Sequence, residues 1–73
     1  MAQKVLVVDD EENICFTLGR FLSDEGYQVT TAGDFETALG EIERIDFDLV
    51  FADIFLKGRK GTDILKAVNK KKN

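Results

Sequence analysis

A chain of 73 residues has room for one small domain, so we expect residues 1–73 to form a single folded unit with a barely sufficient core. Hydrophobic residues make up 44% and charged residues 33%, which excludes a disordered chain, and the net charge of -4 argues against general nucleic-acid binding. The one cysteine, Cys15, excludes an internal disulfide, and no apolar run is long enough to span a bilayer, so we expect a cytoplasmic protein without membrane contact.

The charges are unevenly distributed along the chain. Residues 1–56 carry 13 acidic and 3 basic side chains, whereas residues 57–73 carry 1 acidic and 7 basic ones. The basic end is typical of a solvated helix end, where cations also suit the helix dipole; a phosphate or nucleic-acid contact is the alternative.

Three segments have strand character. Residues 4–8 and 48–53 are short apolar runs, typical of strands buried on both faces of a parallel sheet. Residues 27–32 are more polar and fit an edge of the sheet.

The segments between and after these strands have helical spacing. In the first, Ile14, Leu18, Phe21 and Leu22 are expected to form one buried face, which Cys15 borders as a small buried group. Gly26 is expected to end this helix in the left-handed conformation, and Asp34 to cap the next one. The apolar face of that second helix is Phe35, Ala38, Leu39, Ile42 and Ile45. The third helix, residues 62–72, has Ile64, Leu65 and Val68 as its apolar positions.

Strands that alternate with helices predict an α/β fold with right-handed crossovers and a parallel sheet. With residues 4–8 as the central strand, the first helix covers one face and the other two cover the opposite face. The carboxyl ends of strands 4–8 and 48–53 then lie side by side.

That edge of the sheet would collect Asp9, Asp10 and Asp53. Three carboxylates close together need a cation or a proton to offset their charge. Oxygen ligands of this kind suit Mg²⁺, and the absence of histidine argues against zinc or copper. An aspartate there can also attack phosphorus and carry a phosphoryl group. The alternative is a solvated strand end whose acidic residues cap a helix.

Several motifs at matching spacing resemble the response-regulator receiver domain of two-component signalling. They are the opening Val5–Glu11, the segment Gly26–Val29, Ala32 with the later pair Ala38-Leu39, and Asp48–Leu56 with Gly61 eight residues beyond Asp53. The resemblance covers nearly the whole chain and implies a flavodoxin-like, doubly wound parallel sheet.

The resemblance also implies roles for single residues. Asp53 would be the phosphoacceptor for a sensor histidine kinase, Asp10 a direct Mg²⁺ ligand, Asp9 a ligand through water, and the backbone carbonyl of Phe55 a further ligand. Receiver domains promote their own aspartyl phosphorylation and dephosphorylation, although they are not conventional enzymes.

Two departures from the family pattern stand out. Lys57 takes the place of a common proline four residues after the phosphoacceptor, and the chain ends within or just after the third helix. The family's fourth and fifth strands, with a Ser or Thr and a Lys that bind the phosphoryl oxygens, have no counterpart in residues 1–73. We therefore expect the first three-fifths of a receiver, with impaired phosphorylation.

Two other functions remain open. Gly58 and Gly61 frame a G-x-x-G like the loop that KH modules clamp on nucleotides, but a strand precedes it here, which disfavours direct nucleic-acid binding. The stronger alternative is a non-signalling assembly module. It would form a homodimer because strand 48–53 becomes an uncovered edge that a second copy can bury.

Overall fold

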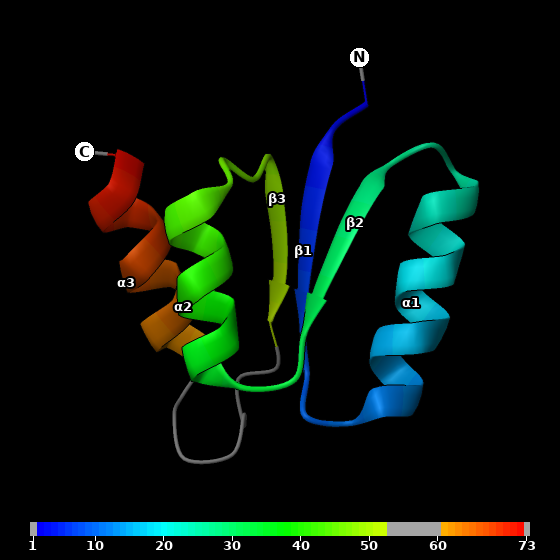
Figure 1. The fold of residues 1–73 in the computed structure, drawn as a ribbon, viewed down its shortest axis with the longest axis horizontal. Helices are drawn as coiled ribbons and strands as arrows, with labels where there is room; N and C mark the ends of the chain where they lie inside the picture. Colours follow the sequence, from blue (N-terminus) through cyan, green and yellow to red (C-terminus); the bar gives the residue numbers. More distant parts are fainter. Residues whose placement is uncertain (1, 53–60, 73) are drawn as a thin grey trace.

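The computed structural model describes residues 2–52 and 61–72 and has the predicted alternation of strands and helices (Figure 1). The elements are β1 (Lys4–Val8), α1 (Glu12–Asp24), β2 (Gln28–Ala32), α2 (Phe35–Arg44), β3 (Leu49–Ala52) and α3 (Gly61–Lys72). The predicted α/β fold class is confirmed, and the strands begin within one residue of their predicted starts.

The sheet is parallel, with β1 between β2 and β3. Val8, the last residue of β1, pairs with Ala32 of β2 on one side and with Ala52 of β3 on the other. At the opposite end, the Lys4 amide donates to Oδ2 of Asp48 at 2.8 Å, and the Asp48 amide donates to the Lys4 carbonyl at 2.8 Å. The predicted central position of β1 is therefore confirmed, and the carboxyl ends of the strands are level.

The two faces of the sheet are covered unequally. Figure 1 shows α1 on one face and α2 with α3 on the other, as predicted. Alternate residues of β1 point to opposite faces, so Val5 and Val7 pack towards α1, whereas Leu6 and Val8 pack towards α2 and α3. The larger cluster lies under the two helices and comprises Leu6, Val8, Ala32, Ala38, Ile42, Phe47 and Ile64.

The buried face of α1 differs from the predicted one. Cys15 and Leu22 are buried and Leu18 is half-buried, but the side chains of Ile14 and Phe21 are 42% and 60% exposed. Predicting Ile14 and Phe21 as core residues was wrong.

The contacts between α1 and β2 show which side of the helix meets the sheet. A Cβ atom on Gly19 would lie 3.4 Å from Cγ2 of Thr31 and 3.6 Å from Cγ1 of Val29. The helix therefore turns Cys15, Gly19 and Leu22 towards the sheet. The side chains of Ile14 and Phe21 then lie on one flank of α1, where they remain exposed.

The helix ends follow local sequence rules. Gly26 has φ of 100°, a conformation that costs glycine little, and it lies just past the end of α1 as predicted. At the start of α2, Oδ1 of Asp34 accepts a hydrogen bond of 2.7 Å from the Thr37 amide, which confirms the predicted cap.

The Asp34 cap predicts a pH-dependent contribution to stability. Hydrogen bonds from the backbone and side chain of Thr37 lower the pKa of the Asp34 carboxyl. Its contribution is therefore complete above the ordinary pKa of an aspartate and is lost as the pH falls through the lower folded-state pKa. We expect Asp34→Ala to lower Tm by roughly 5 °C at neutral pH. In acid, where the wild-type cap is also lost, the difference should shrink.

Melting curves followed by circular dichroism between acidic and neutral pH check this expectation. Asp34→Asn is the matched control, because asparagine keeps a capping oxygen without the titrating charge. Equal Tm values for the wild type and Asp34→Ala at neutral pH would show that the cap contributes nothing.

Candidate functional site

The candidate site lies where β1 and β3 end together. Val8 and Ala52 are partners in the register, and neighbouring strands of a sheet lie about 4.8 Å apart. The residues that follow them in sequence are Asp9 and Asp53. Asp53 and Phe55, two of the four predicted site residues, lie outside the described residues.

Asp9 is held in place by its own backbone and side chain. Its amide donates to the Ala32 carbonyl at 3.1 Å, which continues the β1–β2 ladder one residue beyond the strand. Its Oδ1 accepts a 2.9 Å hydrogen bond from the Glu11 amide. The half-buried Asp9 carboxylate is therefore fixed at the edge of the sheet.

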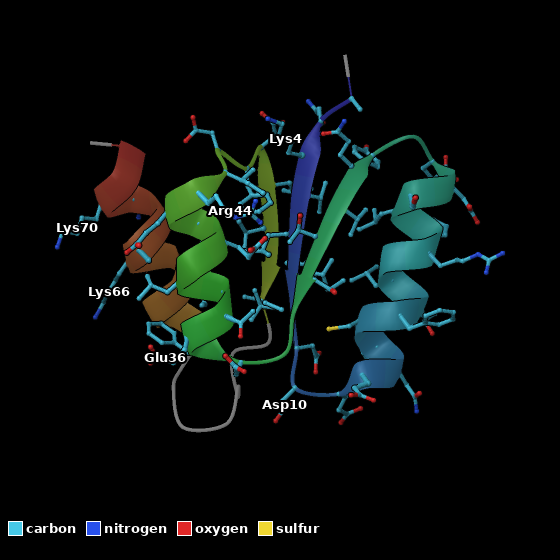
Figure 2. All side chains as sticks on the ribbon, in the orientation of Figure 1. Lys4, Asp10, Glu36, Arg44, Lys66 and Lys70 are labelled. Carbon is cyan, nitrogen blue, oxygen red and sulfur yellow. The ribbon has the colours of Figure 1, made fainter. Side chains whose placement is uncertain are left out.

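Asp10 is exposed on the loop between β1 and α1. Figure 2 shows its side chain at the end of the molecule where β1 ends, directed away from the sheet. The predicted neighbours Asp9 and Asp10 are thus present at this edge, one fixed and one accessible to a ligand.

Within residues 2–52 and the described part of α3, no group of three metal-ligating side chains occurs. Asp9 and Asp10 supply carboxylate oxygens from adjacent positions of one loop. An oxygen-only set of this kind fits a hard cation such as Mg²⁺, which is typically held by one or two carboxylates and keeps several waters.

Cys15 connects α1 to the candidate site. Its thiol donates to the Asp9 carbonyl at 3.2 Å and lies 3.8 Å from the Ala32 carbonyl. Burial raises the pKa of the Cys15 thiol, and the negative charges of Asp9, Asp10 and Glu12 raise it further. The thiol therefore stays protonated and acts as a donor. The prediction of a small buried group is confirmed, while this connecting hydrogen bond was not foreseen.

No helix in the described part of the chain is long and apolar enough to cross a membrane.

Comparison with known proteins agrees with this geometry. The family model for the response regulator receiver domain matches residues 5–73. The sensory transduction protein RegX3 of Mycolicibacterium smegmatis is 44% identical over 62 residues, which are 85% of this chain and 27% of RegX3. The chain thus spans about a quarter of that relative's length.

Solved structures show the same fold. The chemotaxis protein CheY4 of Vibrio cholerae superposes with a TM-score of 0.92 at 33% identity, over 99% of this chain and 60% of CheY4. The response regulator TrrA of Thermotoga maritima, solved with Mg²⁺ and BeF, gives a TM-score of 0.86 at 40% identity, over 96% and 61% of the two chains. TrrA has also been solved in complex with the histidine kinase ThkA, and there it gives a TM-score of 0.84 at 39% identity, over 94% and 60%. By sequence and fold, this chain belongs to the response regulator receiver domain family.

Proposed function

We propose that this chain is the phosphoacceptor module of a two-component response regulator, in which Asp53 receives a phosphoryl group from the phosphohistidine of a sensor kinase. The observation that carries this proposal is the register of β1 and β3, which pairs Val8 with Ala52. Asp9 and Asp53 are the residues that follow these two neighbouring strand ends in the sequence. The complex of the relative TrrA with a histidine kinase supports the choice of partner.

The proposed reaction is a displacement at phosphorus. A carboxylate oxygen of Asp53 forms the new P–O bond, the P–N bond to the donor histidine breaks, and the histidine nitrogen keeps the electron pair and takes up a proton. A bound Mg²⁺ would neutralise charge between the carboxylates and the incoming phosphoryl group. Asp10 would hold it directly, Asp9 through water, and Asp53 and the Phe55 carbonyl would complete the protein ligands.

The metal site can be tested without phosphorylation. We expect Mg²⁺ to bind weakly to the wild type and not measurably to Asp10→Ala, because this substitution removes the exposed carboxylate at the site. Titration by calorimetry or NMR measures both affinities.

Asp24→Ala is the control for this titration. It removes the same kind of carboxylate from the opposite end of α1, so it should bind Mg²⁺ like the wild type. Equal Mg²⁺ affinity in the wild type and Asp10→Ala would show that Asp10 is not a ligand of the metal.

A second proposed property is self-association, alone or alongside signalling. Its basis is β3, the outer strand of the described sheet, on which Leu49 and Phe51 remain 45% and 39% exposed. Burying such side chains against a second copy would stabilise a homodimer.

A further inference from the structure

β2 presents one row of backbone groups away from the rest of the sheet. Within the described sheet it pairs with β1 alone (Figure 1). The Gln28 amide and the Ala32 carbonyl both make hydrogen bonds on the β1 side. Since backbone groups alternate sides along a strand, those of Val29 and Thr31 point outward. In the described part of the chain these outward groups have no backbone partner.

This edge belongs to the fold of the whole family. In the flavodoxin-like strand order 2-1-3-4-5, the fourth and fifth strands join beyond β3, and β2 remains an outer strand. The CheY4 structure superposes over 99% of this chain, so its match includes β2. The open edge of β2 therefore does not depend on where these 73 residues end.

An open hollow lies beside this edge, on the face of the sheet that carries α1. Its volume is about 680 Å³, within the range of ligand sites. Val29 and Thr31 of β2 line it together with Gly19 of α1, which their side chains approach closely. Phe16 lines it too and is 69% exposed. A strand added to β2 would lie about 4.8 Å further out, and its side chains opposite Val29 and Thr31 would enter the hollow.

The charges that line the hollow favour a basic group at one end. Arg20 and Asp24 pair with each other, with 3.9 Å between Nε and Oδ2. Glu12 has no ion-pair partner among the described residues. It begins α1 and Gly33 follows β2, so both lie at the carboxyl edge of the sheet, where the neighbouring Asp10 adds negative charge. Because Gly33 has no side chain, a lysine or arginine opposite it has room to reach Glu12.

We propose that β2 binds an extended segment of a partner protein, which adds as an antiparallel strand along Val29 and Thr31. Antiparallel pairing is slightly more stable per residue than parallel pairing. The segment carries two β-branched apolar side chains two positions apart, which fill the hollow. A lysine or arginine two positions before them pairs with Glu12. A helical partner would leave the outward groups of β2 unpaired, because a helix satisfies its own backbone.

The probe is an acetylated and amidated peptide of sequence GKTVTVTG, whose lysine and two valines lie on one face of a strand. Titration of this chain with the peptide is followed by NMR. We expect the amide signals of Gly19, Val29 and Thr31 to shift. Hydrogen exchange at the Val29 and Thr31 amides should slow at least about tenfold at saturation, because peptide carbonyls accept hydrogen bonds from them.

A charge exchange tests the contact with Glu12. The peptide in which glutamate replaces the lysine should bind the wild type at least about threefold more weakly, and added salt should reduce this difference. Glu12→Lys should reverse the preference between the two peptides. Equal affinity of the wild type for both peptides would overturn the proposed basic segment.

Two further variants test the backbone and the hollow. Thr31→Pro removes one outward amide and keeps the ladder to β1, since an edge strand tolerates proline on its outer side. We expect it to weaken peptide binding at least about tenfold. Phe16→Ala should also weaken it about tenfold, whereas Phe21→Ala, on the exposed flank of α1, should change it by less than about twofold. Circular dichroism checks folding, and Phe16→Ala with Glu12→Lys carries the test if Thr31→Pro does not fold.

Three results would overturn the proposal. They are no shift along β2 with millimolar peptide, unchanged affinity in folded Thr31→Pro, and shifts along β2 that occur without peptide and grow with protein concentration. The last result would show that a second copy of the chain occupies the edge instead. The proposal is independent of the phosphoryl chemistry, so Asp53→Asn should bind the peptide like the wild type, and the two failures can be told apart.

Discussion

Leu6→Ala is expected to remove half or more of the free energy of unfolding of this domain. Leu6 is fully buried in the central strand, within the larger core cluster under α2 and α3. Removing a buried leucine side chain costs about 2–5 kcal/mol, the upper end applying where the surroundings cannot collapse into the cavity. A domain of this size has only about 5 kcal/mol of net stability, or a little more. One substitution therefore removes half of it or all of it.

Urea unfolding at a fixed protein concentration measures the change. Leu39→Ala is the graded comparison, because Leu39 is only half-buried on α2 and its loss should cost clearly less. If the two variants unfold at the same urea concentration, the cluster around Leu6 is not the main source of stability.

A protein of these 73 residues is expected to be phosphorylated by a small phosphodonor at least about 10²-fold more slowly than the relative TrrA. The family places a Ser or Thr and a Lys against the phosphoryl oxygens, and these 73 residues hold no counterpart of the strands that carry them. Losing one preorganised donor slows a reaction by about 10²-fold or more. The free-energy barrier to phosphorylation of Asp53 should rise accordingly.

Parallel time courses with phosphoramidate and Mg²⁺ measure the two rates. Asp24→Asn is a control for general charge effects, since Asp24 lies at the end of α1 remote from the candidate site. Labelling of this chain within about threefold of the TrrA rate would show that the absent donors matter far less than their role implies.

Much of the fold could be predicted because neighbouring residues determine it. The apolar run Lys4–Val8 predicted the central strand. The capping side chain of Asp34 predicted the start of α2, and the backbone freedom of Gly26 predicted the end of α1. The order of the sheet followed from strand polarity, because the apolar β1 fits the centre and the more polar β2 fits an edge. Each of these inferences needs only local chemistry or the handedness of crossovers.

The orientation of α1 could not be predicted in the same way. Ile14, Leu18, Phe21 and Leu22 have helical spacing, but the spacing does not say which side of so broad an apolar surface meets the sheet. The contacts of Cys15, Gly19 and Leu22 with the sheet fix this side, and they depend in part on a strand later in the sequence. The burial of Phe47, just before β3, was missed too, although an apolar residue next to a buried strand is a usable signal.

The site was predictable in part. Asp9 and Asp10 were recognised from their place after a buried strand, and the structure puts both at the expected edge. The hydrogen bond from the Cys15 thiol to the Asp9 carbonyl could not be foreseen, because it depends on the rotation of α1. Asp53 and Phe55 lie outside the described residues, so their roles stay predictions.

The most direct test of the central claim is to map the phosphoryl group on the chain. After exhaustive incubation with phosphoramidate and Mg²⁺, acyl phosphates are reduced with borohydride and the modified residue is located by mass spectrometry. We predict that all label lies on Asp53, that Asp53→Asn carries none, and that chelating the Mg²⁺ prevents labelling. Label on another residue, or equal label in Asp53→Asn, would contradict the assignment of Asp53 as the phosphoacceptor.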